Sequence, residues 1–273
     1  MLNITSLTGR YHRQCPSTPS LDVTGPTMRE QLPMSPSLAA FYINLDRRLD
    51  RREHIEGQLQ RIGITAERVS ATTPADLAPD RIAAVAGTMS PTELACSVSH
   101  QRIWQLMLDR GLSGALIIED DALLSASLRD VLANPGLSSR LDALQLESHP
   151  SDALLGPPIP VAEGISINRL MSSSLGTCAY YITADFAARM LERPNLDRLA
   201  VDRLLFGRGG GMIYRARIYQ SVPALAVQLG MFASPSIAAG RSDLEPARVA
   251  GRTRRVRSLA GRLAKIRLNG GHA

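Results

Sequence analysis

The chain has 273 residues, a hydrophobic content of 44% and a formal net charge of +6. This length suits one large α/β domain or two small ones, and the apolar content is sufficient for a hydrophobic core. No apolar run approaches the roughly 18–20 residues of a membrane-spanning helix. The three cysteines are widely spaced and show no paired metal-ligand spacing, so we expect free thiols in a reducing, cytoplasmic compartment.

The positive charge is concentrated near the C-terminus. Eight basic residues and no acid follow Glu245, and removing them leaves 31 − 8 = 23 basic against 25 acidic residues, a charge of −2. The remainder is therefore not a basic nucleic-acid-binding protein, and no nucleic-acid partner is predicted. The eight residues are Arg248, Arg252, Arg254, Arg255, Arg257, Arg262, Lys265 and Arg267.

The first ordered elements are predicted after residues 1–37, a Ser-, Thr- and Pro-rich stretch that we expect to be a disordered extension. Residues 38–45 form a plausible strand, and a helix is predicted over 47–62 with Asp46 as its N-cap. A second strand over 64–69 completes a β-α-β unit, which favours a parallel sheet of the nucleotide-binding type. The glycine motifs of dinucleotide enzymes and P-loop ATPases are absent from the sequence.

A strong helix start lies at residues 90–93, Ser-Pro-Thr-Glu. Serine is a good N-cap, proline suits the first helical position, and glutamate closes a capping box. The helix is predicted to end at Gly111. His100 and Trp104 stand one turn apart and share a face of it. This spacing fits a packing face with a hydrogen-bonded histidine as well as a functional site.

The apolar run 114–118 leads into three consecutive carboxylates, Glu119, Asp120 and Asp121. Such a run predicts a strand buried on both faces, and its carboxyl end is where open α/β sheets bind ligands. Adjacent carboxylates repel one another, and a hard cation such as Mg²⁺ or Mn²⁺ takes oxygen ligands of this kind. The alternative is a solvated acidic turn.

The second half of the chain alternates short strands, loops and one capped helix. Thr183 is predicted to cap that helix. The predicted elements are a strand at 141–146, a Pro-rich loop at 154–160, an edge strand at 165–170, a strand at 178–182, a helix at 184–191 and a strand at 212–219.

Several separated segments together resemble glycosyltransferase family 25, and their order and spacing cover about residues 40–236. The chain departs from the family pattern in its N-terminal extension, its basic tail, and the valine at 201, where a proline is usual. The segments are Tyr42–Arg47 with Arg51 and Arg52, Leu94–His100, Leu116–Asp121, Gly176–Ile182, Val201 with Asp202, and Gln220–Ala224.

The resemblance implies a GT-A-like α/β fold with a mostly parallel sheet. It also implies transfer of a sugar, often galactose, from a UDP-sugar to a saccharide or lipid-linked saccharide of cell-surface lipooligosaccharide or polysaccharide. Mn²⁺ or Mg²⁺ would neutralise the charge that develops on the β-phosphate of the leaving UDP. Asp121, with Glu119 or Asp120, is the expected metal anchor. Because consecutive strand residues point to opposite faces, Glu119 and Asp121 are expected to share one site, and Asp120 needs another partner, an arginine or the backbone.

The same resemblance suggests residues for the donor and the acceptor. An arginine at 47, 51 or 52 could face the diphosphate, although 51 and 52 also suit a solvated helix face. Asp202 is the candidate base that takes the proton of the acceptor hydroxyl. The donor-site candidates are Asn44, Leu45, Asp46, Arg52, Ser99 and His100.

Two other functions compete with glycosyl transfer. A metal-dependent phosphoesterase could use the same acids, but such sites generally recruit further His and Asp ligands, and the chain has only five histidines. A catalytically inactive, membrane-associated binding module would use the basic tail instead.

The predicted domains are an extension at 1–37, a glycosyltransferase domain at 38–245 and a basic amphipathic tail at 246–273. A narrow apolar stripe runs through the tail, and basic residues fill most of the remainder, as in a helix that lies on anionic lipid. We therefore expect peripheral attachment to the inner membrane. The stripe consists of Val249, Val256, Leu259, Leu263 and Ile266.

Overall fold

The computed structural model describes residues 38–147, 153–194 and 196–231. Its main sheet has eight strands in the order β2-β1-β3-β8-β5-β9-β7-β6. These strands are β1 (Ala40–Asn44), β2 (Glu67–Ser70), β3 (Gly114–Glu119), β5 (Ala143–Gln145), β6 (Leu155–Ala162), β7 (Ile165–Leu170), β8 (Ala179–Thr183) and β9 (Ile218–Val222). A separate pair consists of β4 (Ala122–Leu124) and β10 (Ala226–Gln228).

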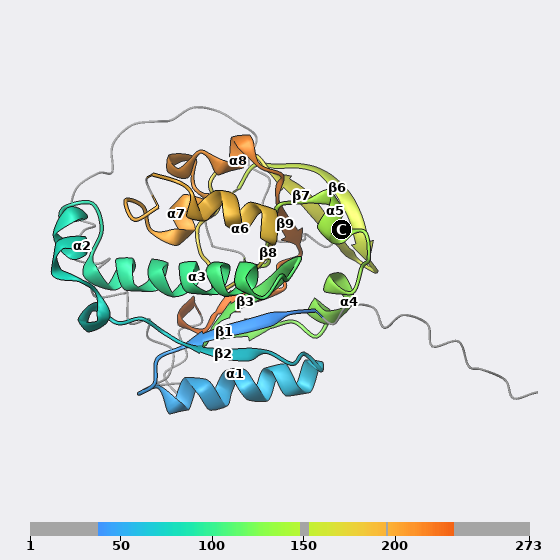
Figure 1. The fold of residues 1–273 in the computed structure, drawn as a ribbon. Coiled ribbons are helices and arrows are strands. Elements are labelled where there is room, and N and C mark those ends of the chain that lie inside the picture. The colour runs from blue at the N-terminus through green and yellow to red at the C-terminus, as the bar shows by residue number, and fades with distance from the viewer. Residues whose placement is uncertain (1–37, 148–152, 195, 232–273) are drawn as a thin grey trace, which may run out of the picture. The chain divides into compact units, whose positions relative to one another are not determined.

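Helices cover both faces of the sheet, with α1 on one side and α3, α6 and α7 on the other (Figure 1). The helices are α1 (Leu49–Ile62), α2 (Pro79–Ala84), α3 (Pro91–Asp109), α4 (Leu128–Leu132), α5 (Leu137–Arg140), α6 (Ala184–Leu191), α7 (Val201–Phe206) and α8 (Met212–Arg215). Single 3₁₀ turns occupy Pro74–Asp76, Arg208–Gly210 and Leu229–Met231. Within the described part of the chain, no helix is both long enough and apolar enough to cross a membrane.

The sheet is mixed but mostly parallel. Strands β1, β2, β3, β5, β6 and β9 run in one direction, and β7 and β8 run against them. The predicted fold class, α/β with a mostly parallel central sheet, is confirmed. The predicted segments 1–37 and 246–273 lie outside the described residues, so the domain boundaries stay predictions.

The alternation of side chains along β3 joins the two halves of the core. Ala115 and Ile117 pack in the cluster that α3 and α6 cover, whereas Leu116 and Ile118 pack in the cluster that α1 and α4 cover. All four residues are fully buried. The prediction of a strand buried on both faces is therefore confirmed, and the same alternation sets the directions of the acids that follow.

The predicted helix signals around α3 and α6 are confirmed. The backbone N–H of Glu93 donates to Ser90 Oγ at 3.2 Å, and the Ser90 N–H donates to the Glu93 carboxylate at 2.9 Å. Thr183 Oγ1 accepts from the Phe186 N–H at 3.4 Å at the start of α6. Gly63 ends α1 with a φ of +66°, a left-handed conformation that glycine adopts readily.

The prediction of Asp46 as the N-cap of α1 is wrong. The helix begins at Leu49, and the residue before it makes no side-chain cap. The Asp46 carboxylate instead accepts from Ser70 Oγ at 2.8 Å and pairs with the Arg68 guanidinium. Arg68 and Ser70 of the neighbouring strand β2 take the place of the amides of the first helical turn.

Three other predicted elements differ in the second half of the chain. The Pro-rich segment 154–160, predicted as a loop, belongs to β6, the edge strand, where missing N–H donors are tolerated. The predicted edge strand 165–170 is β7, which lies inside the sheet between β9 and β6. The predicted strand 212–219 begins as helix α8, and the Arg169 guanidinium donates to the carbonyls of Ile213 at 3.0 Å and Ile218 at 2.7 Å. This contact from β7 is invisible to a local sequence pattern.

Candidate functional site

Polar residues gather where the parallel strands of the sheet end. Asn44 is the last residue of β1, Glu119 the last of β3 and Gln145 the last of β5. These strands run in the same direction, so their carboxyl ends share one edge. The polar side chains are at this edge of an otherwise apolar sheet, which is the place where open α/β sheets bind ligands.

Asp120 points toward α1, away from Glu119. Its carboxylate accepts from Asn44 Nδ2 at 2.7 Å and from Arg51 Nη1 at 3.2 Å. Burial raises the pKa of Asp120, while the charge of Arg51 and the hydrogen bond from Asn44 work in the opposite direction. The arginine partner expected for this residue is present, and the same Arg51 nitrogen lies 3.5 Å from Asp121.

Asp121 and Glu147 form the buried acidic part of the site. Glu147 follows β5, and its Oε2 accepts from the Cys178 N–H at 2.8 Å. Burial raises the pKa of Glu147 to about 8, and the charges of Glu119 and Asp121 add to the rise. Burial and the charge of Glu119 raise the pKa of Asp121 to about 7, although Arg51 lies 3.5 Å from its carboxylate.

Four buried side-chain atoms in the described residues lack a hydrogen-bond partner, and all four belong to this region. They are His100 Nε2, Asp121 Oδ1, Gln145 Oε1 and Glu147 Oε1. Buried polar atoms are almost always paired, so these unpaired atoms need an explanation. Carboxylate and amide oxygens are the ligand type that Mg²⁺ and Mn²⁺ prefer, so the residue types suit such an ion, but no three of the described acids bring their ligand atoms within 4.8 Å of one another.

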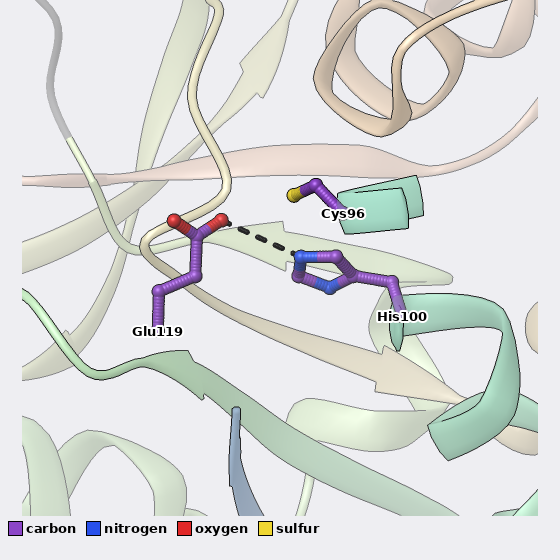
Figure 2. Close-up of side chains that lie close together, drawn as sticks. All are labelled: Cys96, His100 and Glu119. Atoms are coloured by element: carbon purple, nitrogen blue, oxygen red, sulfur yellow. Dashed lines mark ion pairs between the residues drawn. The ribbon is translucent and has the colours of Figure 1, made fainter. Parts of the chain in front are cut away.

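Glu119 faces α3, on the side of the sheet opposite to Asp120. Thr177 Oγ1 donates to Glu119 Oε1 at 2.7 Å, and His100 Nε2 lies 3.4 Å from the same oxygen (Figure 2). The imidazole is fully buried, and its Nδ1 hydrogen-bonds to the Tyr180 hydroxyl at 2.9 Å. Trp104 Nε1 donates to that hydroxyl at 3.0 Å. The shared helical face of His100 and Trp104 is thus both a packing face and part of the site.

The loop of residues 171–178 contacts the acids from the start of β8. Gln145 Nε2 donates to the carbonyls of Ser174 at 3.2 Å and Gly176 at 3.0 Å. Gly176 has a φ of +111°, and a Cβ there would lie 2.3 Å from Glu147 Oε2. Only glycine fits, because both the backbone conformation and the close carboxylate exclude a side chain.

A hollow of about 390 Å³ lies at the carboxyl ends of β1 and β2. Asn44 precedes Leu45 of its lining, and the Asn44 amide group bonds to Asp120 and to Arg68. The predicted donor residues Leu45 and Asp46 line this hollow. The complete lining is Leu45, Asp46, Arg47, Ser70, Ala71, Thr73, Asp76 and Arg102.

Two predicted donor residues have other surroundings. Arg52 is exposed and pairs with Glu56 at 2.9 Å along α1, so Arg51 and not Arg52 reaches the carboxylates. Ser99 Oγ accepts from the Thr72 N–H at 2.8 Å and donates to the Ala95 carbonyl. It connects α3 to the segment after β2, and its hydroxyl does not contact the acids.

Asp202, the predicted base, is buried in the first turn of α7. Its Oδ1 accepts from the Arg203 N–H at 2.7 Å. The preceding Val201 N–H donates to Ser97 Oγ at 3.1 Å, which joins this turn to α3 next to Cys96. Asp202 therefore lies on the α3 side of the sheet, the side toward which Glu119 points.

Comparison with known proteins identifies the family. The family model described as "Glycosyltransferase family 25 (LPS biosynthesis protein)" matches residues 38–205. The lacto-N-neotetraose biosynthesis glycosyltransferase LgtE of Neisseria gonorrhoeae is 30% identical over 236 residues, which cover 78% of this chain and 82% of that protein. LgtB of Neisseria meningitidis serogroup A is 28% identical over 204 residues, covering 68% of this chain and 72% of that protein.

Some relatives are much longer than the matched region. A glycosyltransferase 25 family member of Drosophila melanogaster is 34% identical over 94 residues, which are 30% of this chain and only 15% of that protein. The family match over residues 38–205 and the similarity to LgtE nevertheless indicate the same family. This chain belongs to glycosyltransferase family 25. The mostly parallel sheet with helices on both faces is consistent with the GT-A-like fold expected of it.

Sequence reasoning did not identify Glu147 or Gln145, and it included Thr177 only as part of the family segment Gly176–Ile182. Glu147 and Gln145 each stand alone among apolar or small residues and carry no motif of their own. Glu147 reaches the acids because β8 pairs with both β3 and β5, a pairing that only the tertiary structure shows. The available signal was weak, namely that a strand predicted at 141–146 is followed directly by a glutamate.

Proposed function

We propose that this protein transfers a sugar from a UDP-sugar to a hydroxyl group of a saccharide or lipid-linked saccharide. Galactose is the sugar that we propose. The observation that carries the proposal is the group of unpartnered oxygens on Asp121, Gln145 and Glu147 at the carboxyl ends of the strands. Family membership gives the reaction class, and the similarity to LgtE and LgtB supplies the analogy with lacto-N-neotetraose biosynthesis.

The acids are proposed to hold a divalent cation, Mn²⁺ or Mg²⁺. Glu119 and Asp121, predicted from the sequence, are joined in this set by Glu147. A bound cation would act as a Lewis acid on the diphosphate and stabilise the negative charge of the departing UDP. Asp120 is better suited to position Arg51, which lies within 3.5 Å of both Asp120 and Asp121.

The hollow beside Asn44 is proposed to receive the nucleoside end of the donor. Leu45 and Ala71 offer apolar surface there, and Asp46 and Ser70 offer oxygens to the sugar and base. Leu45 in its lining follows Asn44, whose amide bonds to Asp120, so the hollow is at the same edge of the sheet as the acids. Asp202 is the proposed base that accepts the proton of the acceptor hydroxyl.

A lipid-linked acceptor would lie at a membrane surface, which suggests a role for the basic C-terminal segment. We propose that residues 246–268 attach the enzyme to the cytoplasmic face of an anionic membrane. A lipid-linked acceptor would then be concentrated at the same surface. Each basic residue near such a surface contributes about 1 kcal/mol, so eight of them are sufficient for reversible attachment.

A donor screen tests the reaction. The full chain is incubated with a panel of UDP-sugars, with Mn²⁺, Mg²⁺ or EDTA, and release of UDP is measured with and without saccharide acceptors. We expect UDP release with one preferred sugar, loss of release in EDTA and acceleration by an acceptor. Cleavage of simple phosphoesters without sugar transfer would identify a phosphoesterase. No donor turnover with any UDP-sugar would reject the proposed donor class.

A further inference from the structure

A second cluster of possible metal ligands lies between α3 and the end of β3. Cys96 and His100 come from α3 and Glu119 comes from β3, and their side chains point into the same space (Figure 2). One ligand atom from each, a sulfur, a nitrogen and an oxygen, lies within 4.8 Å of the other two. We propose that these three residues bind a borderline-soft divalent ion such as Zn²⁺. The proposal does not depend on glycosyl transfer.

The helix fixes two of the ligands. Cys96 and His100 are four residues apart in α3, a spacing that places both on one helical face. The capping box formed by Ser90 and Glu93 sets where this helix begins. Because both ligands lie in one turn of a capped helix, their backbone is ordered before the ion binds. This order reduces the entropy cost of binding.

The orientation of the imidazole suits a metal ligand. Its Nδ1 bonds to the Tyr180 hydroxyl, which Trp104 Nε1 holds in place. A partner on one ring nitrogen is the usual arrangement in metal sites, because it orients the ring and directs the other nitrogen to the metal. That other nitrogen, His100 Nε2, is buried and has no hydrogen-bond partner.

The distance between His100 and Glu119 also fits. His100 Nε2 lies 3.4 Å from Glu119 Oε1, but their geometry is not that of a hydrogen bond. Two ligands that each bind Zn²⁺ at about 2.0–2.2 Å in a tetrahedron are roughly 3.3–3.5 Å apart. The two atoms therefore already have the separation that a shared ion requires.

The ligand types select the ion. A sulfur and an imidazole nitrogen favour Zn²⁺ and related ions, whereas Mg²⁺ and Mn²⁺ prefer oxygen ligands. The set of oxygens around Asp121 and Glu147 thus differs in ligand type from the set around Cys96, and Glu119 is the one residue assigned to both. Three protein ligands leave a fourth tetrahedral position for water or for an oxygen of a substrate. Cys96 is only partly buried, which gives the ion a route of entry.

Cobalt binding provides a direct test, because a Co²⁺–thiolate bond has a strong charge-transfer absorption. Full-length protein carrying Cys15→Ser is freed of metal with a chelator and titrated with Co²⁺ and then Zn²⁺. We expect one equivalent of Co²⁺ with thiolate absorption, displaced by Zn²⁺ but not by Mg²⁺. Cys96→Ser should abolish the absorption, and His100→Gln should weaken binding by at least about 10–100-fold, the loss caused even by outer-shell changes.

Two matched variants make the result specific. Cys178→Ala removes the other described cysteine and should retain the thiolate absorption, and so should Asp121→Asn, which belongs to the proposed oxygen site. Absence of thiolate absorption in the parent protein, or its persistence in Cys96→Ser, would overturn the assignment. Neither result depends on whether the protein transfers sugar.

Discussion

Arg51 and Asp120 form a buried ion pair that connects α1 to the end of β3. Arg51 Nη1 lies 3.2 Å from Asp120 Oδ1, and the two side chains are 5% and 9% exposed. The next residue along the helix, Arg52, is also paired with an acid, Glu56, but both of those side chains are more than 40% exposed. The two arginines are adjacent in sequence and each pairs with an acid, but only the Arg51 pair is buried. Substituting each in turn therefore compares a buried ion pair with an exposed one.

Arg51→Gln is expected to destabilise the protein by about 3–5 kcal/mol, because it leaves Asp120 buried without its cation. Arg52→Gln should leave the free energy of unfolding nearly unchanged, since exposed pairs contribute little. Chemical denaturation of both variants measures the difference. Equal effects of the two substitutions would contradict the assignment of Arg51 to the site.

Asp121→Asn and Glu119→Gln should each reduce metal-dependent transfer by at least about 10²–10³-fold, since the charge stabilisation of the leaving group is lost. Both variants should remain folded by circular dichroism. The measurement is UDP release over a range of Mn²⁺ concentrations. Near wild-type turnover in folded Asp121→Asn would show that the cation does not bind there.

The metal-free protein should become less stable as the pH rises from about 4 to about 8. Burial raises the pKa of Asp121 from 3.8 to about 7 and that of Glu147 from 4.5 to about 8. A raised carboxyl pKa means that the folded state binds protons more tightly than the unfolded state. Stability is therefore complete below the unfolded values and is lost as the pH rises through the folded ones.

Denaturation curves at a series of pH values measure this slope. Glu147→Gln should flatten it, and saturating Mn²⁺ should restore stability at the alkaline end, because a ligand that binds only the folded state stabilises it. The explanation fails if wild type and Glu147→Gln show the same slope.

Asp202→Asn should lower kcat far more than it weakens donor binding, because a base acts in the proton transfer itself. Titration with UDP gives the donor affinity, and initial rates at saturating donor give kcat. Similar losses in both quantities would instead place Asp202 among the residues that bind the donor or the cation.

Removal of residues 246–273 should abolish binding to anionic vesicles while donor hydrolysis continues. The reason is the eight basic residues, each contributing about 1 kcal/mol near an anionic surface. Co-sedimentation with phosphatidylserine-containing vesicles at moderate salt compares the intact chain with one truncated after Glu245. Equal pelleting of the two proteins would reject attachment through this segment.

The elements that position the site could be predicted from patterns among neighbouring residues. The apolar run before Glu119, the capping box at 90–93 and the cap at Thr183 each depend on neighbours within a few residues, and each is observed. The opposite directions of Glu119 and Asp120 also follow from the period of two along a strand. These features could be predicted because short-range geometry decides them.

The remaining features depend on contacts between distant segments. Asp46 is a good N-cap in isolation, yet Arg68 from β2 binds its carboxylate. The prolines of 155–162 fit a strand only because that strand is at the edge of the sheet. Glu147 joins the acids through the pairing of β8 with β5. Sequence patterns do not specify which strands become neighbours, so none of these could be derived from them.

The direction of β8 has a consequence for how this site can diversify. Because β8 runs against β3 and β5, the loop 171–178 enters it at the edge where those strands leave the sheet. The acids are thus contacted by a segment whose composition is not constrained by strand pairing. Within this loop, the Ser174 and Gly176 carbonyls accept from Gln145 and the Thr177 hydroxyl donates to Glu119. The surroundings of the acids can therefore change through substitutions in one short loop, without a change in the pairing of the strands.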